Sequence, residues 1–507
     1  MQHRSFIALI IAAMTLIGCA ESFTPEQSGY WLSRLEDETT RIDALKNLGK
    51  FKEPAVVDAV IKWLEQKGDW QPDAAYTLGE LGDTKAIPNL IAAIDYAGAP
   101  GKSARSRRIN KTNINAGRAL AMLKTDAALD PIMRLTNSSD QNTVQASLES
   151  LGNLGNQGAI KTLTDFATTA SHPFIRKTAV ISLGKIGGAD AVAPLIVALY
   201  QELPGVSFYL EARQALVEVG PIAIPALLET LDRKNAAVEA VRLTDGQPIA
   251  EGAIEGKAAF VLGILRAQQA ESKLASSMTD FYTKFKKDES VFASIPGAVS
   301  EIAYALGYIG GKDAQAAAER IVVDTNPNLR IAGAESLIEM GAKGSTGLLS
   351  KIAASGTGDQ KSVLDALAML GSTSEVATLQ AAATKDATLK AAVDSGLKAL
   401  EAASTCKDDA ACWRGKLADP SATVRRRAVR ELGWSVDQSS LDALLKAAED
   451  DDPRVRIAAH SALVRLKGVD IEKLKSIHKT WSSKSEYRNA NKDLTRTIAV
   501  IKNAPKA

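Results

Sequence analysis

The chain has 507 residues, of which 46% are apolar, 5% are aromatic and three are cysteines. Its formal charge is +2, or +1 once Arg4 is lost with a leader, so no global field favours nucleic acid or an acidic membrane. The low aromatic content disfavours a β-sandwich, and three cysteines are too few for a disulfide scaffold or a four-ligand zinc site.

The first residues predict an exported, lipid-anchored protein. A basic start at Arg4 is followed by an apolar run over 6–17, shorter than the roughly twenty residues that span a bilayer. The run ends in Leu16-Ile17-Gly18-Cys19, which resembles the lipobox of bacterial lipoproteins. This resemblance implies a signal peptide over 1–18, a lipid on Cys19 and a short tether over 19–23. An ordinary secretory leader that contains a cysteine by chance is the alternative.

The residues after Cys19 indicate where the anchored protein sits. Ala20 follows in place of Asp, a pattern that resembles sorting to the outer membrane in Gram-negative lipoproteins, facing the periplasm. Thr24-Pro25-Glu26-Gln27 has the form of a capping box, which predicts that helix begins there. The tether therefore reaches roughly 15 Å, at about 3.5 Å per residue. We expect the N-terminal end of the folded part to lie close to the membrane.

A five-residue phrase, Leu-small-x-apolar-Gly, recurs along the rest of the chain. Its best copies begin at Leu78, Leu151, Leu183, Leu306 and Leu367, and looser copies begin at Leu48, Leu120, Leu216, Leu262, Leu337, Leu397, Leu432 and Leu463. The successive spacings are 30, 42, 31, 32, 33, 46, 44, 31, 30, 30, 35 and 31 residues. A period near 31 is typical of a stacked array in which each repeat is one helix pair.

Each repeat carries its own start and stop signals. In one copy, Pro173 stands where a first helix can begin, an apolar stripe runs from Ile175 to Leu183, and Gly187 ends the helix. A second helix follows, with Pro194 near its start. At two other repeat boundaries Asn326 and Asp452 are good N-caps.

This phrasing resembles HEAT repeats, particularly the short HEAT-like type also found in phycobilin lyases, over roughly residues 35–480. The resemblance implies an all-α fold, an α-solenoid or superhelix of about thirteen helix pairs, with residues 24–507 as one array. The copy at Leu397 is the most degenerate. An arginine recurs at one phase of the repeat, and this resembles the structural basic position of HEAT repeats and implies pairing between repeats. These arginines are Arg176, Arg330, Arg425 and Arg456.

Three long spacings predict insertions on one edge of the array, near 98–112, 232–256 and 276–296. Insertions confined to one edge are typical of a binding surface. The first is basic and the third sets aromatics beside lysines, so an anionic partner suits them. The candidate partner-binding residues are Lys102, Arg105, Arg107, Arg108, Lys111, Phe281, Tyr282 and Phe285. The alternative is that these segments are solvated loops.

Cys406 and Cys412 are the remaining cysteines. An exported protein sits where thiols oxidise, so we predict a disulfide between them, with two free thiols as the alternative. Six residues of unbroken helix would hold their Cα atoms about 9 Å apart, too far for that bond. The chain must therefore turn between them.

The sequence predicts no catalytic, cofactor or metal site. The histidines lack a second ligand at helical spacing, so a structural or solvated role is expected for each. The leading hypothesis is a scaffold that binds an envelope protein or complex, is held to the membrane by its lipid, and has neither nucleic acid nor a small-molecule substrate as partner. The rival is a ligand-binding or lyase-type enzyme, as the resemblance to HEAT-like phycobilin lyases implies; that would need polar groups converging on a concave pocket.

Overall fold

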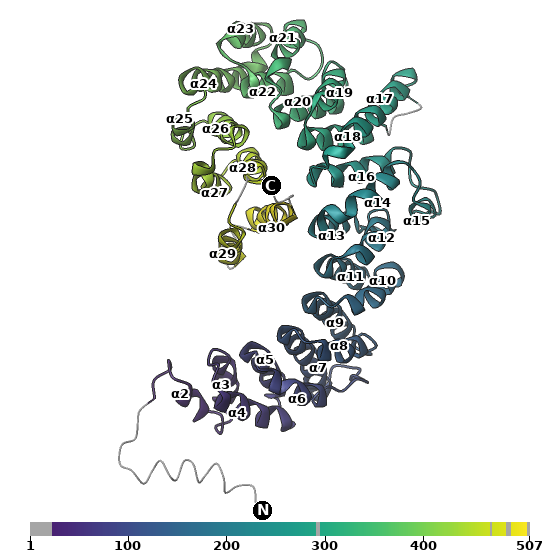
Figure 1. Cartoon of the computed structure of the whole chain (residues 1–507), viewed down its shortest axis with the longest axis vertical. Helices are drawn as coiled ribbons and strands as arrows, with labels where there is room; N and C mark the ends of the chain where they lie inside the picture. Colours follow the sequence, from purple (N-terminus) through teal and green to yellow (C-terminus); the bar gives the residue numbers. More distant parts are fainter. Residues whose placement is uncertain (1–22, 291–294, 467–468, 483–487, 504–507) are drawn as a thin grey trace, which may run out of the picture. The chain divides into compact units, whose positions relative to one another are not determined.

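The computed structural model of the chain describes residues 23–290, 295–466, 469–482 and 488–503. The predicted signal peptide and Cys19 lie outside these residues. The chain divides into two compact units, unit 1 up to Ile186 and unit 2 from Gly187. In each unit short helices follow one another in antiparallel pairs (Figure 1). The predicted all-α solenoid is therefore confirmed.

Thirteen helix pairs follow one another in the described residues, as the repeat spacing predicts. Unit 1 starts with α2 (Ser28–Leu32), and its pairs are α3 (Arg41–Leu48) with α4 (Pro54–Glu65), α5 (Gln71–Leu81) with α6 (Ile87–Ala92), α7 (Ala104–Leu123) with α8 (Leu129–Leu135), and α9 (Gln141–Leu154) with α10 (Ile160–Thr169). The unit boundary falls inside the fifth repeat, after its first helix α11 (Pro173–Ile186) and before its second helix α12 (Ala189–Ala198).

Unit 2 continues the same order to the last described helix. Its pairs are α13 (Tyr209–Val219) with α14 (Ile224–Leu231), α16 (Ala253–Ile264) with α17 (Glu271–Lys287), α18 (Ile295–Ile309) with α19 (Lys312–Val322), α20 (Pro327–Met340) with α21 (Thr346–Ser355), α22 (Gln360–Leu370) with α23 (Val376–Lys385), α24 (Lys390–Cys406) with α25 (Ala410–Lys416), α26 (Ala422–Ser435) with α27 (Leu441–Ala447), and α28 (Pro453–Arg465) with α29 (Ile471–Ser482). Helix α30 (Arg488–Asn503) follows them.

Short elements connect these helices. A small antiparallel hairpin of β1 (Glu202–Leu203) and β2 (Val206–Ser207) joins α12 to α13. Single 3-10 turns precede many second helices: η1 (Thr84–Ala86), η2 (Asp126–Ala128), η3 (Gln157–Ala159), η4 (Gly220–Ala223), η5 (Gln268–Ala270), η6 (Lys343–Ser345), η7 (Thr373–Glu375) and η9 (Gln438–Ser440); η8 (Ala387–Leu389) instead precedes the first helix α24.

The leucine of the repeated phrase is the centre of each repeat's core. Twelve of the thirteen phrase leucines, all except Leu397, have 0% of their surface exposed. Leu397 is half-buried, while Leu400, one turn later on α24, is fully buried. The degenerate copy is therefore a repeat of the array, but its core leucine is Leu400, three residues after the leucine that the phrase predicts. It lies on α24, which is longer than most first helices.

The small residue after that leucine lets successive first helices approach. A Cβ added at Gly79 of α5 would lie 2.6 Å from the Cα of Ala119 on α7, and one at Gly152 of α9 would lie 2.8 Å from the Cα of Ser182 on α11. No side chain fits at such distances, so the phrase requires a small residue there.

The recurring arginines join neighbouring segments through backbone carbonyls. Arg176 Nε donates to Ala170 O at 2.9 Å, and Arg456 Nη1 donates to Asp450 O at 2.6 Å, in each case at the end of the preceding repeat. Arg425 forms a two-point contact with Asp450 of the next loop, at 2.7 Å for both bonds. The pairing between repeats expected of these residues is therefore present, and it satisfies carbonyls that a helix end leaves unpaired.

In two of the three predicted insertions, most of the described residues lengthen a helix of the repeat and do not form a loop. The segment 98–112 lies in α7 from Ala104 onward, with Ser103 as its N-cap. The segment 276–296 continues α17 as far as Lys287. Only 232–256 is mostly irregular: its single short helix is α15 (Ala236–Glu239). The alternative of solvated loops therefore does not hold for 104–112 or 276–287. The charged residues of these two segments obscure an apolar helical period in the sequence.

One segment of the described residues, Tyr209–Leu231, is long and apolar enough to cross a membrane by composition. It is not one helix, because Gly220 takes a positive φ of 83° and Pro221 follows it, which separates α13 from α14. Half of the segment is buried inside the protein. It is therefore a helix pair of the solenoid core.

Candidate functional site

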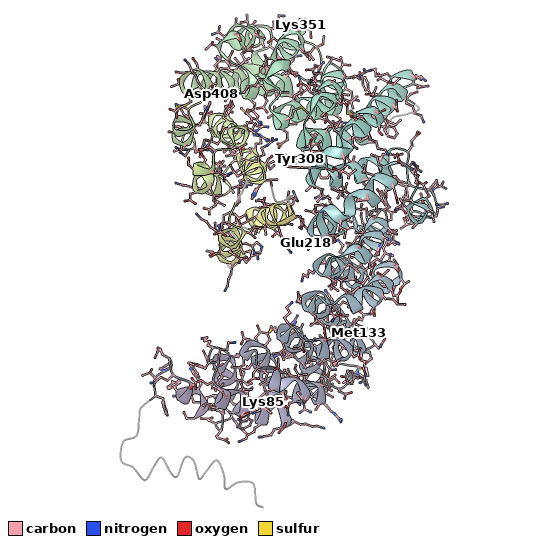
Figure 2. All side chains as sticks on the ribbon, in the orientation of Figure 1. Lys85, Met133, Glu218, Tyr308, Lys351 and Asp408 are labelled. Carbon is pink, nitrogen blue, oxygen red and sulfur yellow. A yellow bond between two sulfur atoms is a disulfide. The ribbon has the colours of Figure 1, made fainter. Side chains whose placement is uncertain are left out.

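Unit 2 closes on itself through its last described helix. Asn503 Nδ2, at the end of α30, donates to the carbonyl oxygens of Val217 and Glu218 on α13, at 3.1 Å each. Val500 of α30 packs in the same contact against Val217 and Ile264 of α16. Helices α13, α16 and α18 thus face α28 and α30 across the interior of this unit, where Glu218 and Tyr308 are labelled in Figure 2.

Glu339 of α20 is the centre of a buried ion cluster in this interior. Its carboxylate accepts from Arg430 of α26, from Arg465 of α28 at 3.1 Å and from Ser461 of α28, and lies 3.7 Å from Arg266 beyond the end of α16. Burial alone would raise the pKa of Glu339, but the charges of Arg430, Arg465 and Arg266 outweigh burial and lower the pKa to about 2. The ionised carboxylate therefore ties four helices together at neutral pH.

A second set of ions extends the cluster along α26. Arg426 bonds to Glu335 of α20 at 2.9 Å and to Asp365 of α22. Arg427 bonds to Glu431 one turn later, and also donates to the carbonyl oxygens of Ala368 at 2.9 Å and Gly371 at 3.3 Å. These arginines are almost fully buried, and their long side chains cross from α26 to helices two and three repeats earlier. These contacts connect α26 directly to α20 and α22 within unit 2.

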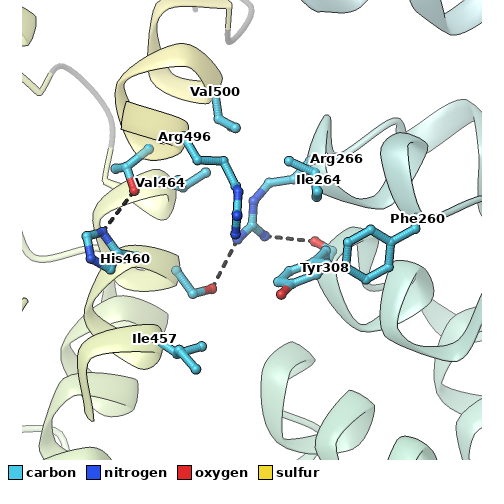
Figure 3. Close-up of a pocket in the computed structure, with 11 residues that line it drawn as sticks. Phe260, Ile264, Arg266, Tyr308, Ile457, His460, Val464, Arg496 and Val500 are labelled. Carbon is cyan, nitrogen blue, oxygen red and sulfur yellow. Dashed lines mark hydrogen bonds between the residues drawn. The ribbon is translucent and has the colours of Figure 1, made fainter. Parts of the chain in front are cut away.

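A cavity of about 90 Å³ lies beside the Glu339 cluster (Figure 3). His460 of α28, Arg496 of α30, Arg266 and Tyr308 of α18 are among its lining residues, together with apolar side chains such as Phe260. His460 Nδ1 pairs with Thr497 Oγ1 of α30 at 3.0 Å. Burial, with the nearby charge of Arg496, lowers the pKa of His460 to about 4, so the imidazole is neutral at pH 7. A structural histidine was predicted, and this one joins α28 to α30.

Local sequence patterns do not predict this interior. Only Arg425 of the run Arg425-Arg426-Arg427 was singled out, and the expectation that no polar groups converge on an inner pocket is wrong. The available signal was α26 itself: it carries arginines on all sides, which a helix exposed on one face does not need. Their partners lie about 60 to 90 residues away in sequence, so the pairing could not be read from local spacing.

The predicted basic residues lie on the first turns of α7 in unit 1. Lys102, Arg105, Arg107 and Lys111 are exposed, and Arg108 is half-buried. The guanidinium group of Arg107 donates to the carbonyl oxygen of Lys102. Lys102 precedes the N-cap Ser103, and Arg105, Arg107, Arg108 and Lys111 follow in the first turns of α7.

A cavity of about 520 Å³ lies between α4, α6 and α7, and Arg105 and Arg108 line it. Three polar atoms of its lining residues are buried and have no hydrogen-bond partner among the described residues: Tyr96 Oη, Arg108 Nε and Thr112 Oγ1. Burial raises the pKa of Tyr96, so its hydroxyl stays a neutral donor. Two of the five predicted basic residues therefore face a hollow and three face solvent.

The predicted aromatic surface at 276–296 is not a surface. Phe285 is 3% exposed, Phe281 is half-buried and Tyr282 donates to Asp324 of α19 at 2.8 Å. The physical reason is that Leu274, Met278, Phe281 and Phe285 recur at four and three residues, which makes one apolar stripe on α17. These aromatics contribute to the packing of α17 onto its neighbours, and the burial of Phe285 removes that residue from the candidate partner-binding surface.

Cys406 and Cys412 are joined in a disulfide, with their Cα atoms 5.3 Å apart. Cys406 ends α24 and Cys412 lies in α25, and the chain turns between them at Lys407, which has a φ of 46°. The predicted turn is therefore present, and it begins at Lys407, directly after Cys406. The bond links α24 to α25, the two helices of the repeat whose phrase is degenerate.

The described residues contain no group of three or more His, Cys, Asp or Glu side chains placed to hold a metal ion. In the interior of unit 2 the carboxylates are paired with arginines and His460 is uncharged. A neutral buried imidazole and paired ions stabilise a fold more readily than they transfer protons.

Comparisons with known proteins agree with the repeat pattern. The model for HEAT repeats matches residues 104–180, 132–216 and 414–486, and the model for the PBS lyase HEAT-like repeat matches residues 73–96. No curated protein sequence matches the chain.

Solved structures that match the chain include three of low sequence identity and low TM-score. The complex of CpcE and CpcF of phycocyanin lyase from Nostoc sp. PCC7120 is 21% identical, with 48% of this chain and 90% of that chain covered and a TM-score of 0.29. Importin beta is 11% identical, with 94% and 71% covered and a TM-score of 0.46. Human deoxyhypusine hydroxylase is 15% identical, with 66% and 99% covered and a TM-score of 0.23.

Proposed function

We propose that this chain, a solenoid of HEAT repeats, is a lipid-anchored interaction scaffold of the bacterial cell envelope. The observation that carries the proposal is the continuous order of thirteen helix pairs behind a lipobox-like Leu16-Ile17-Gly18-Cys19. Stacked repeats present long faces whose side chains are not needed for folding, and such faces suit a protein partner. Cys19 would hold the N-terminal end of the array at the membrane.

The exposed basic turns of α7 support an acidic partner. Lys102, Arg105, Arg107 and Lys111 stand together in unit 1 with no acidic residue between 102 and 111, and exposed charges of one sign steer an oppositely charged protein. The half-buried Arg108 and the cavity beside it would accept an acidic side chain of that partner. Periplasmic location follows from the same leader, with the outer membrane as the proposed site of the anchor.

The anchor is tested by changing Cys19 in the native host. The Cys19→Ala variant is expected to leave the membrane fraction and to lose the mass of the lipid, because the thiol that carries the acyl chains is gone. Ala20→Asp is the matched variant, since it keeps the lipid and tests only the sorting signal. A Cys19→Ala protein that stays in the membrane with unchanged mass would show that the anchor assignment is wrong.

The scaffold role is tested by cross-linking the wild-type lipoprotein in its own envelope and identifying its partners by mass spectrometry. Charge reversal at Lys102, Arg105, Arg107 and Lys111 is expected to reduce recovery of the specific partner and to make the remaining binding less dependent on salt. Reversal of Lys161 and Lys46, exposed elsewhere in unit 1, is the control. Equal recovery from both variants would remove the α7 surface from the interface.

The second candidate function is a ligand-binding or lyase-type protein, which would use the polar interior of unit 2 as its site. Its cavity of about 90 Å³ and a neighbouring one of about 240 Å³, lined by Tyr304 and Arg454, are small. Pockets for organic ligands commonly measure about 300 to 1,000 Å³, and a tetrapyrrole needs the upper part of that range. An absorbing ligand retained by the purified protein would establish the rival.

A further inference from the structure

The interior of unit 2 carries more buried positive charge than its carboxylates balance. Arg266, Arg430 and Arg465 share the single carboxylate of Glu339. The adjoining set has one arginine, Arg426, between Glu335 and Asp365. Four arginines therefore face three carboxylates in these paired groups. Burial, and then repulsion from Arg465, lowers the pKa of Arg266 to about 10.

The cavity in Figure 3 lies at the positive end of this cluster. Its lining, drawn from described residues, includes the guanidinium groups of Arg266 and Arg496 and no carboxylate. The hydroxyl groups of Tyr308, Ser461 and Thr497 also line it. Ser461 already donates to Glu339, and Thr497 is paired with His460. The two guanidinium groups and the Tyr308 hydroxyl are the groups of this wall that suit a negatively charged occupant.

His460 gives an independent sign of a missing acceptor. Its side chain is 8% exposed, its Nδ1 is paired with Thr497 Oγ1, and its Nε2 is buried without a hydrogen-bond partner among the described residues. Thr497 Oγ1 can donate to Nδ1, and the neutral ring then carries its proton on Nε2. A buried N–H without an acceptor costs roughly 1 to 3 kcal/mol, so an occupant that accepts from it stabilises the closed unit.

The volume limits what the occupant can be. About 90 Å³ is well below the roughly 300 Å³ at which pockets for organic ligands commonly begin. This admits one tetrahedral oxyanion and excludes a nucleotide, a sugar phosphate or an organic cofactor. The apolar walls at Phe260, Ile264 and Val500 keep the local dielectric low, which strengthens attraction between an anion and the arginines.

We propose that this cavity binds a small inorganic oxyanion, phosphate or sulfate, and that the bound anion closes unit 2. Arg266 follows α16, Arg496 and Thr497 lie on α30, and His460 lies on α28, so one anion would join three elements that are far apart in sequence. Its negative charge would offset the excess of the arginine cluster. The site is separate from the proposed partner surface in unit 1.

The test uses the full mature chain made soluble by Cys19→Ala, titrated with sodium phosphate and with sodium sulfate against sodium chloride at constant ionic strength. Saturable binding by calorimetry and a rising melting temperature are expected with both oxyanions, because a ligand of the folded state shifts unfolding by mass action. Slower amide hydrogen exchange in α13 and α30 should accompany binding. Chloride alone having the same effect as phosphate, or no saturable binding of either oxyanion, would overturn the proposal.

Two variants and one control locate the site. Arg266→Gln and His460→Leu are each expected to weaken phosphate binding about ten-fold or more, since each removes a buried donor to a charged group. His460→Leu also removes the unpaired Nε2, so it should leave the anion-free protein folded while the phosphate response falls. Arg454→Gln, which changes the neighbouring cavity only, should bind phosphate as the wild type does. Wild-type affinity in Arg266→Gln would refute this location.

Discussion

At the scale of single residues, unit 2 is decided by a few buried charges. Glu339 is compensated only because Arg266, Arg430 and Arg465 arrive from three other elements. A buried ion pair adds little stability over an apolar packing, but the loss of one partner leaves an uncompensated charge in a low dielectric. The effect of a substitution therefore depends on which partner is removed.

Glu339→Gln is expected to destabilise unit 2 by about 3 to 5 kcal/mol, because it leaves three arginines without a carboxylate. Urea unfolding followed by circular dichroism is the measurement. Glu149→Gln is the matched control: Glu149 pairs with Arg118 at 3.6 Å on the surface, so its loss should change stability by less than about 1 kcal/mol. Equal losses in the two variants would show that the Glu339 cluster is not a structural centre.

The same residues predict a loss of stability in acid. The pKa of His460 is lowered from 6.5 to about 4, so between these values the unfolded chain takes up a proton that the folded chain does not. Stability therefore falls as the pH drops below 6.5, by about 2 kcal/mol at pH 5. The pKa of Glu339, lowered from 4.5 to about 2, adds a second loss below pH 4.5. Unfolding at pH 7 and pH 5 measures the first step, and His460→Gln should remove it.

At the scale of single elements, α7 shows how a segment that looks like a loop becomes structural. Asn110 forms a pair of hydrogen bonds with the backbone of Ala99, at 2.9 and 3.0 Å, and Asn113 forms a similar pair with Asp95, at 2.7 and 2.9 Å. These amides fasten the connection from α6 to the helix. Removal of 98–112 would therefore damage unit 1, contrary to the idea of a dispensable insertion.

Asn113→Ala is expected to cost roughly 1 to 3 kcal/mol, because it unpairs a backbone N–H and a carbonyl oxygen that face the fully buried amide. Hydrogen exchange of the amides at 95–103 should become faster by a corresponding factor. Lys111→Ala, an exposed change on the same helix, should leave that exchange as it is. Unchanged exchange in Asn113→Ala would mean that the connection is held by other contacts.

At the scale of the whole molecule, the question is how an open array of pairs becomes a closed unit. A solenoid repeat touches mainly its neighbours, so stability normally adds along the sequence. Unit 2 departs from this rule, since α30 bonds to α13 across more than 280 residues. Closure removes a free end of the array and places the charged interior out of water.

Val500→Asp is expected to release α30 from α13 and α16, because it sets a charge among Val217, Ile264 and Phe260. Hydrogen exchange should rise in α13 and α16, while the overall helix content by circular dichroism falls only slightly. Lys502→Asp, an exposed change on the same helix, supplies the control for added negative charge. Native-like protection of α13 in Val500→Asp would show that closure does not depend on this contact.

The sequence by itself determined the repeat, the helix pairs, their caps and their core leucines, because each is set by residues within one period of about 31. Tertiary structure alone decided that 104–112 and 276–287 are helix, since their charges hid an apolar period that only the neighbouring helices make visible. It also decided the site in unit 2. Glu339 meets Arg430, Arg465 and Arg266 from 73 to 126 residues away, and no local pattern records which distant charges a curved array will bring together.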